Sequence, residues 1–74
     1  MKSTIHKRIM ESMPDAEVQV DLDGNRATIT VVSDTFAGMS RVQKHQAVYG
    51  AIESFIADGS LHAVSIKALT ATDL

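Results

Sequence analysis

The sequence predicts one α+β domain, a two-layer sandwich in which helices cover a three-stranded mixed sheet. Apolar residues recur at helical spacing near the N-terminus and after residue 40, and three other segments alternate strictly between apolar and polar residues. Each alternating segment has one apolar side, so helices are expected on one face of the sheet only. The expected order is helix, strand, strand, helix, helix, strand. A chain of 74 residues is the size of one such unit, and residues 1–74 are expected to form a single domain.

The first element is an amphipathic helix over about residues 2–13. Its apolar side consists of Ile5, Ile9, Met10 and Met13. Pro14 lacks an amide donor and restricts the residue before it, so the helix is expected to end there.

A β-hairpin follows, made of the segments "AEVQVDL" (16–22) and "RATITVV" (26–32). The apolar sides are Val18, Val20 and Leu22 in the first strand and Ala27, Ile29 and Val31 in the second. Residues 23–25, "DGN", favour a tight turn because Gly24 and Asn25 tolerate positive φ.

The segment "SDTFAGMS" (33–40) is expected to be a loop, and a helical region begins after it. Ser40 precedes Gln43 by three residues, which is the spacing of a capping box at a helix N-terminus. The apolar stripe that follows contains Val48, Ala51, Ile52, Phe55 and Ile56. Gly59 is expected to end the pattern as a C-terminal stop.

Gly50 lies inside this helical pattern, where a glycine costs about 1 kcal/mol relative to alanine. The sequence therefore predicts a break, with a short helix over about residues 40–45 and a longer helix over about 46–57.

The last strand is "HAVSIKA" (62–68). Its inward residues are Val64, Ile66 and Ala68, and its outward residues are Ala63, Ser65 and Lys67. A helical crossover before it implies that this strand lies parallel to the second strand, through a right-handed connection.

Composition excludes several kinds of site. The chain has no cysteine, which excludes disulfides, thiolate zinc sites and a thiol nucleophile, and which is natural for a cytoplasmic protein. No stretch approaches the ~20 apolar residues of a membrane span, and no signal peptide is expected. Seven Lys and Arg stand against nine Asp and Glu, so nucleic acid would have to bind at a local basic cluster. No spaced residue set supports zinc or nucleophilic catalysis, and no enzymatic activity is expected.

Two stretches, "FAGMSRVQKHQAVYGAI" and "LHAVSIKA", closely resemble the BolA-like family. The resemblance covers nearly the whole chain up to Ala68, and the pattern MSRVxKxQxVYG is most similar to the acid-stress-associated bacterial branch. It implies a fold similar to a type II KH domain, which agrees with the predicted order of elements. It also implies a role in iron–sulfur trafficking, in which members pair with monothiol glutaredoxins around a shared 2Fe–2S cluster. Some members are described as transcription regulators.

His62 matches the family's histidine ligand to this bridging cluster. Taken alone, a histidine at the start of a strand is more simply a polar end residue satisfied by a backbone carbonyl. The resemblance favours iron binding instead, because imidazole is a good iron ligand. The chain has no thiolate, so the remaining ligands are expected from the glutaredoxin and its glutathione, and no cluster is expected on the protein alone.

The family's second ligand, a His or Cys in the loop between the first two strands, corresponds here to Arg26. Arginine stays protonated and has no lone pair for a metal. Arg26 either meets the anionic glutathione or cluster, or is a solvated hairpin charge.

The expected contact surface combines the His62 end of the sheet, the loop 23–26 and the start of the second helix. The residues assigned to partner binding are Arg26, Arg41, Ala63 and Lys67, and the free protein is expected to be a monomer or a weak homodimer.

The alternative function is DNA binding by a KH-like transcription regulator, through the basic cluster Arg41, Lys44 and His45. KH domains clamp a nucleic acid backbone with a GXXG loop, which this chain lacks. Aromatic residues for base stacking are also few. Such a cluster is more often a solvated helix face, so any DNA binding is expected to be weak.

Overall fold

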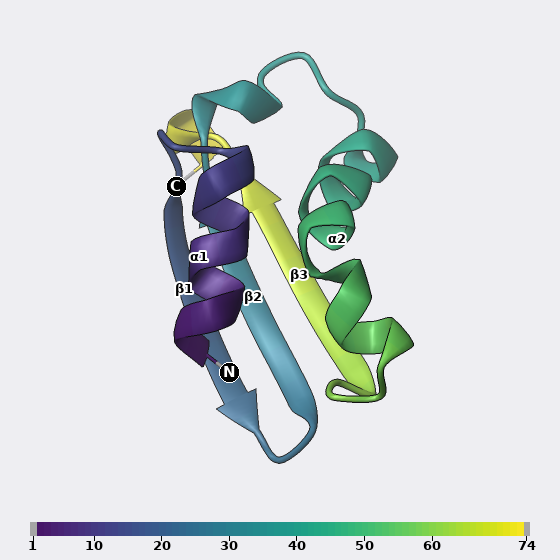
Figure 1. Ribbon diagram of the computed structural model, residues 1–74. Coiled ribbons are helices and arrows are strands. Elements are labelled where there is room, and N and C mark those ends of the chain that lie inside the picture. Colours follow the sequence, from purple (N-terminus) through teal and green to yellow (C-terminus); the bar gives the residue numbers. More distant parts are fainter. Residues whose placement is uncertain (1, 74) are drawn as a thin grey trace.

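Helices cover one face of a mixed sheet in the computed structural model, which describes residues 2–73 (Figure 1). The helices and strands are α1 (Lys2–Ser12), β1 (Glu17–Asp23), β2 (Arg26–Val32), α2 (Arg41–Ala57) and β3 (Ala63–Leu69). Two 3₁₀ turns are also present, η1 (Asp34–Phe36) and η2 (Ala71–Asp73). The predicted α+β class is confirmed, and the predicted boundaries of α1 and of the strands lie within one residue of those observed. No helix within residues 2–73 is long and apolar enough to cross a membrane.

The strands lie in the order β1-β2-β3, so β2 is central and the other two strands form the edges. β1 pairs antiparallel with β2, and Asp23 lies opposite Arg26 next to the turn. β3 pairs parallel with β2, from Ala63 opposite Arg26 to Leu69 opposite Val32. The parallel third strand predicted from the crossover is therefore confirmed.

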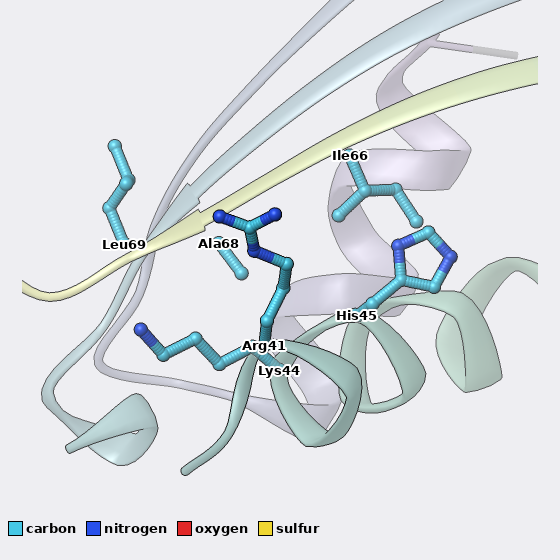
Figure 2. A pocket seen from close by; sticks show the side chains of 6 residues that line it. All are labelled: Arg41, Lys44, His45, Ile66, Ala68 and Leu69. Atoms are coloured by element: carbon cyan, nitrogen blue, oxygen red, sulfur yellow. The ribbon is translucent and has the colours of Figure 1, made fainter. Parts of the chain in front are cut away.

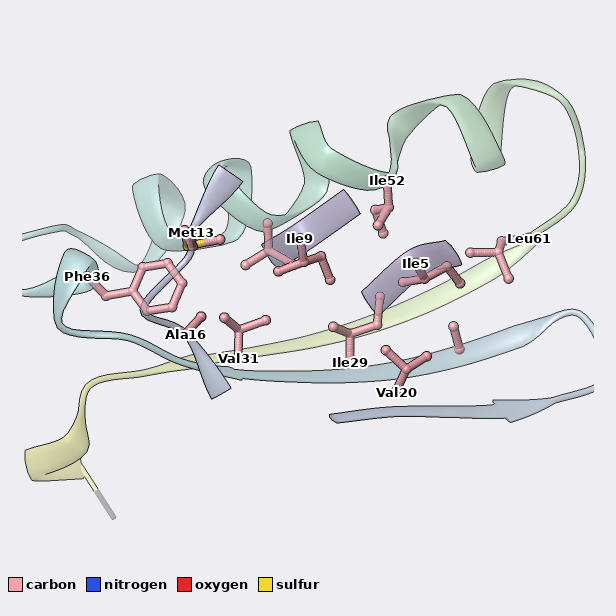
Figure 3. Close-up of a cluster of buried hydrophobic side chains, with 12 residues drawn as sticks. Ile5, Ile9, Met13, Ala16, Val20, Ile29, Val31, Phe36, Ile52 and Leu61 are labelled. Atoms are coloured by element: carbon pink, nitrogen blue, oxygen red, sulfur yellow. The ribbon is translucent and has the colours of Figure 1, made fainter. Parts of the chain in front are cut away.

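The hydrophobic core lies between the helices and the inner face of the sheet (Figure 3). Its large, fully enclosed side chains are Ile5, Ile9, Val20, Ile29, Val31, Phe36, Val48, Ile52 and Leu61. Burial of one such side chain contributes roughly 1.5–3 kcal/mol. The alternation predicted for β2 is confirmed, because Ala27, Ile29 and Val31 are all buried.

A polar link joins two connections at the end of the sheet farther from the hairpin turn. The Ser33 hydroxyl donates to Asp15 Oδ2 at 2.9 Å and accepts from the Thr35 N–H at 3.1 Å. The Thr35 hydroxyl donates to Asp15 Oδ1 at 3.3 Å. Ser33 is buried, and these bonds satisfy its hydroxyl. They hold the turn between α1 and β1 against η1.

The β1–β2 hairpin closes through Gly24 and Asn25. Gly24 has a φ of 63°, whereas no non-glycine residue within 2–73 has a positive φ. The connection follows the type II′ pattern, in which the first central residue is glycine. The predicted turn is confirmed, although Asn25 does not use the positive φ that it would tolerate.

The predicted break in the second helical region is wrong. α2 begins with the predicted capping box, in which the Ser40 and Gln43 side chains each accept the other residue's backbone N–H, and it continues through Gly50. The buried side chains of Val48 and Ile52 lie on either side of Gly50 in sequence and hold the helix on the core. This packing outweighs the cost of one glycine, about 1 kcal/mol. The additional helical turn is η1, inside the segment that was expected to be a loop.

β1 is less buried than its alternation predicts. Val20 is buried and Val18 half-buried, but Leu22 is 37% exposed. Leu22 lies next to the hairpin turn, where the hairpin extends past the N-terminal end of α1 (Figure 1). The outer end of this edge strand therefore has no helix above it.

Gly50→Ala is expected to stabilise the protein by roughly 0.5–1 kcal/mol. A Cβ at Gly50 would meet no atom within 4 Å, so alanine improves the helix without a clash. Urea and thermal unfolding measure the change. Gly59→Ala is the matched control, because its Cβ also meets no atom within 4 Å but its φ of 82° strains any other residue, and it should destabilise. A loss of stability in Gly50→Ala would contradict the continuous helix.

Candidate partner-binding site at the start of β3

His62 lies immediately before β3, at the end of the sheet that carries the hairpin turn. Its side chain is exposed. Its backbone N–H donates to Asn25 O at 2.9 Å, and the N–H of Ala63 contacts the same oxygen at 3.5 Å. The contact between His62 and the Asn25 carbonyl is thus made by the His62 backbone N–H and not by its imidazole.

The loop between α2 and β3 holds His62 from the other side. Leu61 is buried, and its N–H donates to Phe55 O at 3.0 Å. Asp58 Oδ1 accepts from the Ser60 N–H at 2.8 Å, which closes a turn of the Asx type. Hydrogen bonding to the side chain and the backbone of Ser60 lowers the pKa of the Asp58 carboxyl, because it favours the ionised form.

Arg26 lies beside this histidine as the first residue of β2. It is paired with Ala63 on β3 and with Asp23 on β1. Directly paired residues place their side chains on the same face of a sheet, so the exposed Arg26 side chain lies between Asp23 and the start of β3.

A cavity of about 240 Å³ lies on the open face of the sheet at this end, which we call the hairpin-end cavity. Its polar side chains are those of Asp21, Asp23, Arg26, Thr28 and Ser65. Ala63 also lines it, and Lys67 follows on the same face of β3, because alternate residues of a strand share a face. Three of the four residues assigned to partner binding therefore share the open face, whereas His62, which precedes Ala63, does not line this cavity.

Arg41 does not join this group. It begins α2 and lines a groove with Ala68 and Leu69, at the opposite end of β3 from His62. The length of β3 separates the two ends by about 20 Å. The expectation that Arg41 shares one contact surface with His62 is therefore wrong. α2 runs back along β3 (Figure 1), so its first residue, Arg41, lies in the groove with Ala68 and Leu69.

The three residues considered for nucleic-acid binding lie together. They line a groove of about 330 Å³, here named the basic groove, whose lining residues are Arg41, Lys44, His45, Ile66, Ala68 and Leu69 (Figure 2). The ring of His45 stacks on that of Tyr49, with centroids 6.0 Å apart and an angle of 18° between the planes. The basic groove is a second surface, and it shares no lining residue with the hairpin-end cavity.

Residues 2–73 contain no group of three or more His, Asp or Glu side chains that could hold a metal ion. The whole chain also lacks cysteine. One exposed imidazole fits a single ligand position of a metal centre whose other ligands come from another molecule. His62 is thus compatible with one ligand position of a shared centre.

Sequence reasoning missed the residues that hold His62 in place. Asn25 was assigned to the turn alone, yet its carbonyl anchors the start of β3. Nothing in the local sequence indicates this contact, which joins distant segments. Asp58 and Ser60 carried a usable signal, because an aspartate before a glycine and a serine is typical of an Asx turn.

The fold and this site together define a small α+β domain that presents one histidine at the end of its sheet. The model of the BolA-like protein family matches residues 4–73. The chain therefore belongs to the BolA-like family. The acid stress protein IbaG of Escherichia coli (strain K12) is 46% identical over 66 residues, which cover 89% of this chain and 79% of that protein.

Solved structures of the family have the same fold. BolA1 from Arabidopsis thaliana matches with a TM-score of 0.88 at 24% identity, over 99% of this chain and 94% of that one. The solution structure of yeast Fra2 matches with a TM-score of 0.74 at 29% identity, over 99% of this chain and 82% of that one.

Asp58→Ala is expected to loosen the loop that presents His62, and amide exchange at Ser60 should become several-fold faster. Because the folded-state pKa of Asp58 is lowered, its contribution to stability is present above the ordinary pKa of about 3.9. This contribution to stability is lost as the pH falls through the lowered pKa of Asp58 in the folded state. The Ser60 amide shift in NMR should therefore titrate below pH ~3.9 in the wild type.

Glu53→Ala is the control. It removes an exposed carboxylate of α2 and should keep the titration of the Ser60 amide shift. A transition of the Ser60 amide shift at the ordinary pKa of aspartate in the wild type would contradict the hydrogen bond between Asp58 and Ser60.

Proposed function

We propose that this chain is a non-enzymatic iron–sulfur partner protein. It binds a monothiol glutaredoxin and supplies His62 as one ligand to a 2Fe–2S cluster held between the two proteins. The observation that carries this proposal is an exposed imidazole on a backbone anchored by Asn25 and by buried Leu61. Membership of the BolA-like family supports it.

The metal ligands that this chain offers call for a cluster shared with a partner. Iron–sulfur clusters are held chiefly by thiolates, and this chain has none, so those ligands come from the glutaredoxin and from glutathione. Histidine in place of thiolate raises the reduction potential of a 2Fe–2S centre. His62 would therefore tune the storage or transfer of the cluster, while this chain catalyses no reaction of its own.

Arg26 is proposed to contact an anionic group of the complex. Its guanidinium stays charged and can donate two parallel hydrogen bonds to a carboxylate, such as those of glutathione. The nearby carboxylate of Asp23 reduces the net charge, so Arg26 acts as a charge at the rim of the interface. Ala63 leaves space beside His62, and Lys67 adds a second cation on the same face.

DNA binding in the basic groove is the second candidate function. The clustering of Arg41, Lys44 and His45 favours it. The chain has a net charge of −2 and offers few phosphate contacts, so we expect this binding to be weak and confined to low salt. An electrophoretic shift with sub-micromolar, sequence-dependent affinity at about 0.15 M salt would contradict this expectation and support a DNA-binding regulator.

His62→Ala should abolish the change that the protein causes in the visible circular dichroism of a cluster-loaded monothiol glutaredoxin. The lost ligand should weaken the complex at least about tenfold, or ~1.4 kcal/mol. The free energy of unfolding should change by no more than about 1 kcal/mol, because the side chain is exposed and the backbone bond to Asn25 remains.

His6→Ala removes an exposed histidine from α1 and is the matched control, which should keep the spectral change. Two outcomes would contradict the proposal: iron bound to the isolated wild-type protein, or an unchanged spectrum with His62→Ala.

Arg26→His should make the bridged cluster longer-lived, because it adds an imidazole on the residue that pairs with Ala63, the neighbour of His62 in the sequence. Arg26→Ala should keep the cluster spectrum and weaken association modestly, in a salt-sensitive way. The decay of visible absorbance in the presence of an iron chelator measures the lifetime. If Arg26→Ala abolished the cluster spectrum while His62→Ala kept it, the ligand assignment would be wrong.

A further inference from the structure

β3 has one edge that no strand of residues 2–73 covers. Ala63 N–H contacts Asn25 O, and Leu69 O accepts from Ser33 N–H, so these two residues of β3 turn their backbone groups toward β2 and its flanks. The N–H and C=O groups of a strand alternate in direction from residue to residue. The residues that turn theirs to the open edge are therefore Val64, Ile66 and Ala68.

The basic groove lies along the second half of this edge. Ile66 and Ala68 are half-buried and form its apolar side. Figure 2 shows the Arg41 side chain extended toward the strand near Ala68, and the His45 ring near Ile66. Lys44 adds a second permanent cation to the same wall. Within residues 2–73, a row of backbone donors and acceptors that no strand pairs with thus runs beside a row of basic side chains.

We propose that the basic groove binds an extended, acidic peptide segment of a partner protein. The segment pairs with β3 as a further strand, through the backbone groups of Ile66 and Ala68. Its alternate side chains are carboxylates directed at α2, where they meet Arg41 and the neighbouring His45.

The spacing of the two elements supports this occupant. Alternate residues of an extended strand are about 6.6 Å apart and lie on the same face. Arg41 and His45 are separated by four residues of α2, which is a rise of about 6 Å along the helix. Two carboxylates in a glutamate–apolar–glutamate pattern therefore match two successive positions of the basic wall, while the apolar residue between them faces the other side of the sheet.

Other occupants fit less well. A nucleic acid would bring phosphates against the carbonyl oxygens of the β3 edge, which repel them, and would leave the edge N–H groups without a strand partner. A second copy pairing β3 with β3 would offer no carboxylate, because "AVSIKAL" contains none, and would bring two copies of Lys67 together. A peptide backbone is complementary to the edge itself, and acidic side chains are complementary to α2.

NMR titration of the ¹⁵N-labelled protein tests the proposal. The probe is a five-residue, acetylated and amidated peptide that alternates glutamate with valine. We expect saturable amide shifts at Ile66 and Ala68, and none with a peptide that alternates lysine with valine. A glutamate–valine peptide methylated at all of its backbone amide nitrogens should lose most of its binding in either strand orientation, because methylation removes the strand hydrogen bonds and keeps the charge.

Arg41→Glu should weaken binding of the acidic peptide about tenfold or more, because it reverses a charge in the groove. An acidic residue at a helix N-terminus is compatible with folding, so α2 should persist. Arg8→Glu makes the same charge change on the exposed face of α1 and should alter binding less than about twofold.

Several results would overturn the proposal. These are shifts confined to β1 or α1, equal weakening by the two charge reversals, and full binding of the methylated peptide. Tighter binding of an oligothymidine to Ile66 and Ala68 would assign the groove to nucleic acid. Shifts at these residues that depend on protein concentration alone would assign it to a second copy of this chain.

Discussion

The parallel pairing of β3 with β2 is the interaction on which the rest of the structure depends. It begins where Asn25 O accepts the N–H of His62 and ends where Leu69 O accepts the N–H of Ser33. A strand cannot lie parallel to its predecessor after a tight turn, so the chain must cross over the sheet, and α2 is that crossover. The same pairing brings the start of β3 against the hairpin turn. A histidine and an arginine that are distant in the sequence thereby become neighbours.

The crossover also separates the two polar surfaces of the molecule. α2 runs back along β3, so its first residue, Arg41, meets the end of the strand, and the loop that follows α2 returns to the start. The hairpin-end cavity contains two carboxylates and one arginine among its lining residues, whereas the basic groove contains Arg41, Lys44, His45 and apolar residues of β3. The two surfaces share no lining residue.

Most elements follow from rules that involve neighbouring residues. Pro14 ends the first helix, alternation defines β2, and Ser40 with Gln43 forms the capping box that the sequence predicts. The prediction failed at Gly50, because helix propensity counts only the local cost of a glycine. Packing of the helix on the core is a tertiary contribution, and it is larger than that cost.

By itself the sequence determined the class of fold, the segments that form strands, and the absence of any thiolate that could hold a cluster. Only the tertiary structure decided that Arg26 lies beside His62, that Arg41 does not, and that Asn25 anchors the start of β3. These facts depend on the register of a parallel pair and on the direction of a helix. Alternation leaves register open, because a strand shifted by two residues keeps every side chain on the same face. Backbone pairing between distant segments selects among such registers.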